Sequence, residues 1–228
     1  MPGETRSRGR FITFEGGEGA GKSTQVERLR SRLSQRGIGV VATREPGGAP
    51  RAERIRSFLL AGRAKALGPA AEAILFSAAR NDHLDTTIRP ALARGQWVLC
   101  DRFSDSTRAY QGALGDLDPT FLTRLEEVVV GATRPDLTLV LDLPPELGLA
   151  RADARRQARS EATDRFEAED IGFHRALRAA FLAIAEEEPA RCVVIDASRD
   201  ADAVAADIWS HVEARLLGAP VGEAGDGA

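Results

Sequence analysis

The chain has 228 residues, which is enough for one sizeable hydrophobic core and too few to favour two full domains. Its composition, 43% hydrophobic and 29% charged, is ordinary for a soluble globular protein. The formal net charge of −3 provides no general attraction to nucleic acid or to an anionic membrane, so we expect neither as a partner.

Five short apolar runs are predicted as strands, in chain order Phe11–Glu15, Val40–Thr43, Trp97–Asp101, Leu137–Leu143 and Cys192–Asp196. They are apolar throughout rather than alternating, which is typical of strands covered on both faces. Helical patterns separate them, at about residues 22–36, 51–61, 70–94, 119–131, 145–159, 168–187 and 200–217. This alternation predicts a three-layer α/β fold, in which a parallel sheet carries helices on both faces.

We expect a single domain over residues 10–217, between disordered ends at 1–9 and 218–228. Within it, residues 151–167 are polar, rich in arginine and lack a convincing apolar stripe, so they are either a solvated helix or a mobile lid. Cys100 and Cys192 lie in apolar runs as small core residues. The absence of a disulfide framework, of an apolar secretory signal and of a long apolar window predicts a cytoplasmic protein without a membrane span.

The first predicted strand runs into EGGEGAGKST, which fits the pattern G-x-x-x-x-G-K-[ST] and precedes a helix. Glycines let the backbone turn its N–H groups around an oxyanion, and the helix presents its positive end there. Lys22 adds a positive charge for the outer phosphates, and the Ser23 hydroxyl is a ligand for Mg²⁺. We therefore predict nucleotide binding by Gly16, Gly17, Glu18, Gly19, Ala20, Gly21, Lys22, Ser23 and Thr24.

Several features of the sequence limit which class of nucleotide-binding protein this loop can belong to. A switch GTPase needs an N-K-x-D element, yet the only lysines are Lys22 and Lys65, and neither lies in one. Mechanical ATPases are usually larger. The arginine clusters instead favour phosphoryl transfer to a second small molecule, since arginine suits phosphate recognition.

Two segments suggest an acceptor site. At the end of the second strand, TREPGG predicts a tight turn that holds Glu45, although a plain surface turn fits the pattern equally well. Phe76 and Arg80 are four residues apart on one helix face, which predicts a nucleobase seat. The alternative is a core phenylalanine with an arginine that reaches out to solvent.

Asp101 ends the third strand, and Arg102 follows it. An acid that ends a buried strand beside a phosphate loop is the expected carboxylate on the Mg²⁺ side, but Asp142 and Asp196 also end apolar strands. We favour Asp101 because the neighbouring arginine could clamp a phosphate. The polar stretch 104–112 carries hydroxyls and an amide that suit ligand binding, or it is simply a polar helix start.

Taken in order, these segments resemble the bacterial thymidylate kinases, a family of P-loop nucleoside-monophosphate kinases. The similar stretches, over about residues 10–215, are FEGGEGAGKST, TREPGG, LFSAARNDH, IRPALARGQWVLCDRFSDSTRAYQG, RPDLTLVLDLP and DRFE. The resemblance implies the reaction ATP + dTMP → ADP + dTDP in dTTP synthesis, with Mg²⁺. It also implies a five-stranded parallel sheet and a homodimer.

The resemblance implies a role for each matching position. Phe76 would stack on thymine, Arg80 would donate to a thymine carbonyl, and Tyr110 would lie against the sugar. The other implied dTMP-binding residues are Glu18, Glu45, Arg56, Arg102, Thr107 and Gln111. Metal binding would fall to Ser23 and Asp101.

Charge in the transition state requires an arginine, which the family places either in the phosphate loop or in the lid. This loop has Gly19 at the matching position, while the lid offers Arg151, Arg155, Arg156 and Arg159. We hypothesise that Arg155 or Arg159 reaches the phosphates, with Arg155 preferred, and that Lys22 and Arg102 complete the catalytic set. For each lid arginine, a solvated helix charge is the alternative. His83, His174 and His211 have no visible metal or triad partner in the sequence and are treated as structural.

Two alternatives stay open. One is a kinase for another nucleoside monophosphate or a deoxynucleoside. The other is a non-catalytic nucleotide sensor on the same fold, which would have lost acids or the lysine; Lys22, Ser23, Asp101 and Arg102 are all present.

Overall fold

The computed structural model describes residues 8–115, 117–159 and 166–218. Residues 1–7 and 219–228 of the predicted tails, residues 160–165 of the predicted lid and the side chain of Arg159 lie outside the described part.

Five parallel strands form one sheet in the order β2-β3-β1-β4-β5, which confirms the predicted fold class. The strands are β1 Phe11–Glu15, β2 Val40–Arg44, β3 Trp97–Asp101, β4 Leu137–Asp142 and β5 Cys192–Asp196. Burial on both faces holds for the central strands β1, β3 and β4, apart from the partly exposed aspartates that end β3 and β4. It fails for β2 and β5, which are partly exposed because they form the sheet edges.

The helices follow the predicted alternation. They are α1 Lys22–Gln35, α2 Pro50–Leu60, α3 Gly68–His83, α4 Arg89–Ala93, α5 Ser104–Thr107, α6 Pro119–Val129, α7 Pro145–Arg159, α8 Ile171–Glu187 and α9 Ala201–Val212. Short turns of other helix types complete the set: η1 Lys65–Leu67, η2 Leu84–Ile88, η3 Arg108–Ala113 and η4 Glu213–Leu217. The helix predicted at 70–94 is therefore divided by the π turn η2, and the stretch 104–112 is helical.

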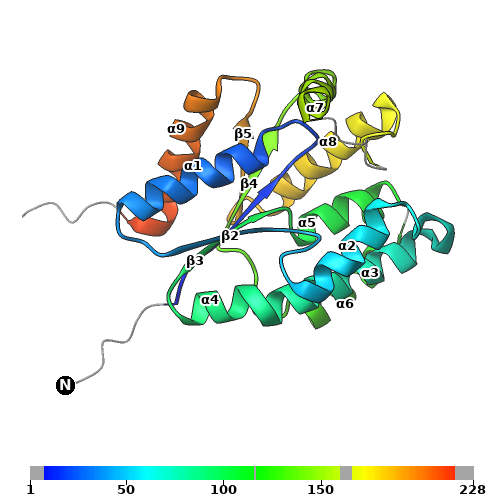
Figure 1. The fold of residues 1–228 in the computed structure, drawn as a ribbon, viewed down its shortest axis with the longest axis horizontal. Coiled ribbons are helices and arrows are strands. Elements are labelled where there is room, and N and C mark those ends of the chain that lie inside the picture. The colour runs from blue at the N-terminus through cyan, green and yellow to red at the C-terminus, as the bar shows by residue number, and fades with distance from the viewer. Residues whose placement is uncertain (1–7, 116, 160–165, 219–228) are drawn as a thin grey trace, which may run out of the picture.

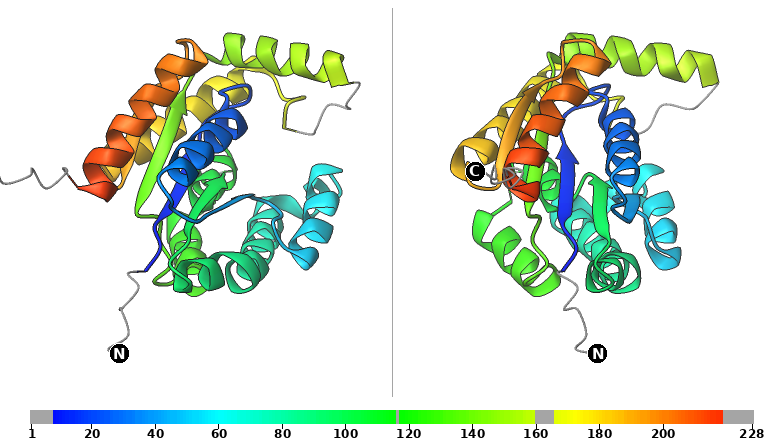
Figure 2. Two further views of the ribbon diagram at one scale, coloured as in Figure 1. Left: turned by 60° about the vertical axis from the view of Figure 1, so that its left-hand side comes forward. Right: turned by 90° about the vertical axis from the view of Figure 1, so that its left-hand side faces the viewer.

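Alternate residues of β1 face two different cores, which makes the fold three-layered (Figures 1 and 2). Ile12 and Phe14 pack with α1 and α9 on one face, whereas Phe11 packs with η2 and α4 on the other. A further cluster on this second face joins α8 and η3 to β4. Because all strands run parallel, their carboxyl ends lie along one edge of the sheet, where ligands collect in such folds.

Candidate active site

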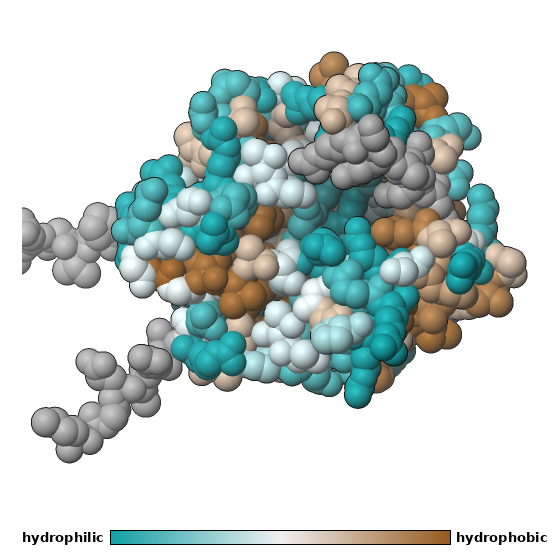
Figure 3. Space-filling view, in the orientation of Figure 1, coloured by the Kyte–Doolittle hydropathy of each residue, from teal (hydrophilic) through white to brown (hydrophobic). Residues whose placement is uncertain are grey.

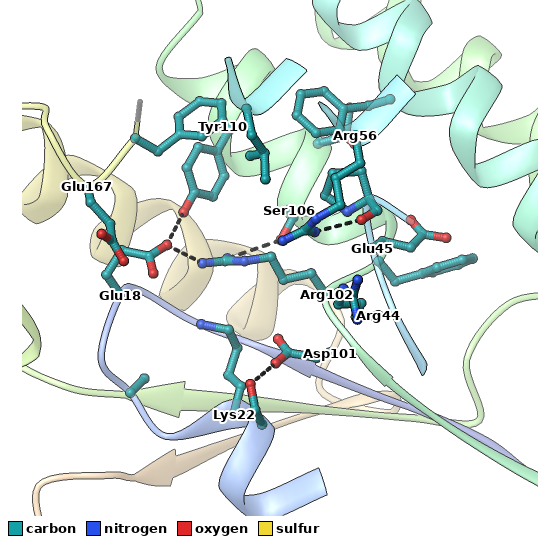
Figure 4. Close-up of a pocket in the computed structure, with 18 of the residues that line it drawn as sticks. Glu18, Lys22, Arg44, Glu45, Arg56, Asp101, Arg102, Ser106, Tyr110 and Glu167 are labelled. Carbon is teal, nitrogen blue, oxygen red and sulfur yellow. Dashed lines mark hydrogen bonds and ion pairs between the residues drawn. The ribbon is translucent and has the colours of Figure 1, made fainter. Parts of the chain in front are cut away.

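A cavity of about 410 Å³ lies at the carboxyl ends of the strands (Figure 4). All nine predicted dTMP-binding residues line it, together with the loop Glu18–Thr24, Asp101 and Arg155. Its lining also contains residues that were not predicted as site residues: Arg44, Pro46, Leu60, Phe103, Ser106, Phe166 and Glu167. All of these except Leu60 belong to motifs that resemble the family, namely TREPGG, CDRFSDSTRAYQG and DRFE, which was the one available signal for them.

The phosphate loop owes its shape to glycines in the left-handed region. Gly16, Gly19 and Gly21 have φ of 131°, 66° and 88°, which side chains rarely tolerate. A Cβ on Gly16 would lie 2.4 Å from the carbonyl oxygen of Leu141. The loop is thereby pressed against β4, and α1 begins at Lys22 directly after the last glycine.

Lys22 is held inside this loop. Its Nζ donates to the carbonyl oxygens of Gly16 and Gly17, at 3.1 and 2.8 Å. Burial, followed by the positive charge of Arg102, lowers the pKa of Lys22 against the opposing carboxylates. The ammonium group thus lies where the motif places the outer phosphates.

Ser23 and Asp101 meet at the predicted metal position. The Ser23 hydroxyl donates to Asp101 Oδ2 at 2.6 Å. The other two candidate acids are engaged elsewhere: Asp142 accepts from Arg178 at 2.6 and 2.8 Å, and Asp196 accepts from Ser198. The structure therefore favours Asp101, a choice that strand position alone left open.

The described residues contain no cluster of three or more histidines, cysteines or carboxylates able to hold a metal alone. One hydroxyl and one carboxylate next to a phosphate loop fit Mg²⁺, which keeps several waters and takes further oxygens from the phosphates of its nucleotide.

Arg102 bridges the phosphate loop and the acceptor side. Its Nη1 donates to the Gly16 carbonyl at 3.0 Å, and its Nη2 pairs with Glu18 Oε1 at 2.5 Å. Burial alone would raise the pKa of Glu18, but Arg102, Lys22 and Arg155 and a hydrogen bond from Tyr110 lower it to about 2. Glu18 is thus an ionised partner for the crowded cations of the site.

Glu15 is a site-proximal residue that sequence reasoning missed. It is fully buried, and its carboxyl accepts from Phe103 N at 2.7 Å and from Ser106 Oγ at 2.6 Å. Burial, and then the charge of Asp105, raises the pKa of Glu15 to about 8. In the sequence, Glu15 was only the last residue of a strand.

Arg80 is buried. The alternative interpretation of the Phe76–Arg80 pair, in which the arginine reaches out to solvent, is therefore excluded. Its Nε donates to Glu45 Oε2 at 2.8 Å, and its Nη2 donates to Thr107 Oγ1 at 3.0 Å and to the Phe103 carbonyl at 3.1 Å. Phe76 lines the cavity one helical turn earlier. The pair therefore forms an aromatic wall with a fixed guanidinium beside it.

Glu45 is likewise buried, so the plain surface turn is excluded. Its second oxygen lies 3.0 Å from Nδ1 of His83, whose Nε2 lies 2.7 Å from Thr43 Oγ1. His83, for which the sequence showed no metal or triad partner, thus contacts a predicted site residue. Nearby, Arg56 Nη1 donates to the Pro46 carbonyl at 2.7 Å.

The arginines of α7 point in different directions. Arg155 lines the cavity and pairs with Glu167 at 3.0 Å, and Arg156 reaches the same carboxylate at 3.4 Å. Arg151 instead donates to the Ala197 carbonyl at 3.0 Å, in the loop after β5. Of the lid arginines whose side chains are described, Arg155 is the one that lines the cavity.

A phosphate loop and an aromatic pocket with fixed polar groups, both lining one cavity of a parallel α/β sheet, define a P-loop protein of the nucleotide-kinase class. A family model for thymidylate kinase matches residues 14–208. On this match, and on the relatives described next, the chain belongs to the thymidylate kinase family.

Similar proteins cover nearly the whole chain. A thymidylate kinase from Rhodopseudomonas palustris is 60% identical over 211 residues, 92% of this chain and 91% of the relative. One from Bradyrhizobium diazoefficiens is 56% identical over 213 residues, 93% of this chain and 92% of the relative. The crystal structure of thymidylate kinase from Ehrlichia chaffeensis has a TM-score of 0.71 at 32% identity, covering 90% of this chain and 99% of that one.

Proposed function

We propose that this protein transfers the γ-phosphoryl group of ATP to dTMP, giving ADP and dTDP for dTTP synthesis. The observation that carries the proposal is that the phosphate loop with Lys22 and the Phe76–Arg80 pair line the same cavity. The family assignment supports the substrate, and it does not favour the two alternatives, a kinase for another acceptor and a non-catalytic sensor.

The donor phosphates would lie in the phosphate loop, against its backbone N–H groups and the first turn of α1. Lys22 would exchange its two loop carbonyls for phosphate oxygens. Ser23 and Asp101 would hold Mg²⁺, which when bound neutralises phosphate charge.

The acceptor would place its base against Phe76 and Arg80 and its phosphate between Arg56 and Arg102. In the reaction, an oxygen of the dTMP phosphate forms a bond to the γ-phosphorus, while the bond from that phosphorus to the β–γ bridging oxygen breaks and ADP leaves. The chain supplies positive charge around the transferring group from Lys22, Arg102 and Arg155.

A coupled assay of ADP release across nucleoside monophosphates tests this proposal. We expect turnover with ATP to depend on dTMP and to be fastest with it. A preference for dUMP, dGMP or a deoxynucleoside would contradict the substrate assignment. No acceptor-dependent turnover with any of them would favour a nucleotide sensor.

We also propose that the protein is a cytoplasmic homodimer. The described residues contain no helix that is long and apolar enough to cross a membrane. Exposed apolar side chains occur on the neighbouring helices α3 and α6, namely Ile74, Phe121 and Val128, and Figure 3 shows apolar surface on the side where α3 lies. This face is the one we propose for the second copy.

A further inference from the structure

A buried chain of hydrogen bonds runs from β2 to the nucleobase pocket. Thr43 Oγ1 lies 2.7 Å from His83 Nε2, His83 Nδ1 lies 3.0 Å from Glu45 Oε1, and Arg80 Nε donates to Glu45 Oε2 at 2.8 Å. His83 is 0% exposed, and Glu45 and Arg80 are almost fully buried. These hydrogen bonds join two segments that are far apart in the sequence, the turn after β2 and the end of α3.

Chemistry fixes the direction of the bond between His83 and Glu45. A carboxylate paired with Arg80 is an acceptor only, so Nδ1 of His83 carries a proton and donates a hydrogen bond to Glu45. In the neutral imidazole, Nε2 then accepts from the Thr43 hydroxyl. Both ring nitrogens are satisfied, and the ring cannot turn without leaving a buried polar group unpaired.

The surroundings of the ring are equally specific. Gly48 has φ of 78°, and a Cβ at this position would lie 2.4 Å from His83 Nε2. The turn therefore approaches the ring as closely as a glycine allows. Thr87 Oγ1 donates to the Gly48 carbonyl at 2.8 Å and holds the turn against η2.

The hydrogen bonds at the Arg80 end of this series determine how its guanidinium faces the cavity. Nε is held by Glu45 and Nη2 by Thr107 and Phe103, which fixes the plane of the guanidinium. Nη1 has no hydrogen-bond partner among the described residues, and Arg80 lines the cavity. This nitrogen is the donor that remains for a ligand.

We propose that His83 is a positioning residue for nucleobase recognition, because it orients Glu45, which in turn orients the Arg80 guanidinium toward the base. The inference rests on the proposed function, in which Arg80 contacts the base of the acceptor. His83 itself does not line the cavity.

Two substitutions separate the two contacts of the ring. In His83→Asn the side-chain amide occupies the place of Nδ1 and keeps the hydrogen bond to Glu45. In His83→Gln the amide occupies the place of Nε2, so the contact with Thr43 survives and the one with Glu45 is lost. We expect the Gln variant to raise the KM for dTMP about tenfold, the effect of losing a hydrogen bond to a charged group, with the Asn variant within about threefold of wild type.

The KM for ATP provides the internal control, and we expect it to stay unchanged in both variants. Equal KM values for dTMP in the Asn and Gln variants, or a parallel rise in the KM for ATP, would overturn the proposal. A lowered melting temperature with a wild-type KM for dTMP would also overturn it, since His83 would then be purely structural.

Should neither variant fold, Thr43→Val keeps the imidazole in place and removes only the hydroxyl that fixes Nε2. We expect the KM for dTMP to rise about threefold and the KM for ATP to stay constant; no change in either contradicts the proposal. If the wild-type protein prefers another acceptor over dTMP, the proposed function fails, and the same comparison made with that acceptor still decides the role of His83.

Discussion

Single residues of the phosphate loop show how charge is balanced before any ligand binds. Glu18, an acid in an anion-binding loop, neutralises Arg102 and lies beside Lys22 and Arg155 in a buried site. Unpaired burial of these cations would cost several kcal/mol, on the order of what a missing partner costs elsewhere. The cations that would bind phosphate are therefore already in position, and Glu18 balances their charge before a ligand binds.

Glu15 predicts a pH dependence of stability. Its pKa rises from the ordinary value of 4.5 to about 8 in the folded protein, so between these values the native state holds a proton that the unfolded chain has released. The stability from this group is full below about pH 4.5 and is lost as the pH rises through about 8. We expect the melting temperature of Glu15→Gln to increase relative to that of wild type as the pH rises from about 6 to about 9.

Glu18, which lies in the phosphate loop, is the matched control. The pKa of Glu18 is lowered to about 2, so its contribution is present above about pH 4.5 and is lost only as the pH falls through 2. The melting temperature of Glu18→Gln should therefore differ from that of wild type by a constant amount between about pH 6 and about pH 9. A constant difference for Glu15→Gln as well would show that Glu15 does not titrate there.

Arg155 is predicted to act on the transferring phosphoryl group. Arg155→Ala should lower kcat at least about thirtyfold, roughly 2 kcal/mol of barrier, with little change in the KM for dTMP. Arg151→Ala is the control, because Arg151 binds backbone carbonyls after β5 and not the cavity. Steady-state kinetics that leave kcat within about threefold in both Arg155→Ala and Arg159→Ala would reject a lid arginine.

Among the elements, α7 is docked directly on the phosphate loop. A Cβ on Gly19 would lie 2.0 Å from the Gly148 carbonyl oxygen, and one on Gly148 would lie 2.3 Å from that of Glu18. Two backbones thus touch without side chains between them. This contact explains why an arginine at position 19 does not fit this chain, and it fixes the start of the helix that carries Arg155.

Gly148→Ala tests this contact, because the direction of its effect on stability depends on whether the two backbones touch. Within a helix, replacing glycine by alanine ordinarily stabilises by about 1 kcal/mol. Here we expect both the melting temperature and kcat to fall, because the new methyl group must push α7 off the loop. Gly39→Ala serves as control, since a Cβ there meets only the Gln96 side chain at 3.6 Å. A Gly148→Ala variant as stable and active as wild type would mean that the contact is loose.

On the scale of the whole molecule, the sheet order brings together chain segments that the sequence separates. β1 lies between β3 and β4, so the phosphate loop after β1 meets Asp101 and Arg102 after β3 on one side. Helices α2 and α3 complete the cavity on its acceptor side, where they contribute Arg56, Leu60, Phe76 and Arg80 to the lining. An exposed apolar face on α3 and α6 remains outside this arrangement.

That face predicts the oligomeric state. Phe121 and Val128 are seven residues apart and share one side of α6, next to Ile74 on α3. Light scattering after gel filtration should give a homodimer for wild type and a monomer for Val128→Arg. Val194→Arg, on the exposed edge strand β5, should remain dimeric. A monomeric wild type would contradict the proposed interface.

The strands were predicted to within one residue because each is a continuous apolar run, and the phosphate loop was predicted because its glycines and lysine are contiguous. The helix at Ser104–Ala113 remained an alternative, since its polar start gives no apolar period. The adjacent Arg102 favoured Asp101 over Asp142 and Asp196 in the sequence, but the hydrogen bond from Ser23 to Asp101 has no local signature, and neither do the contacts of His83 with Glu45 and Thr43.

By itself, the sequence determined the parallel α/β fold, the phosphate loop and, through resemblance, the family, because these depend on residue types at short spacing along the chain. Tertiary structure alone decided which acid meets Ser23, which lid arginine lines the cavity and how Arg80 is held through Glu45 and His83. The physical reason is that hydrogen bonds and charge pairs between buried groups depend on distances of a few ångströms between segments far apart in the chain, and only the packed sheet sets those distances.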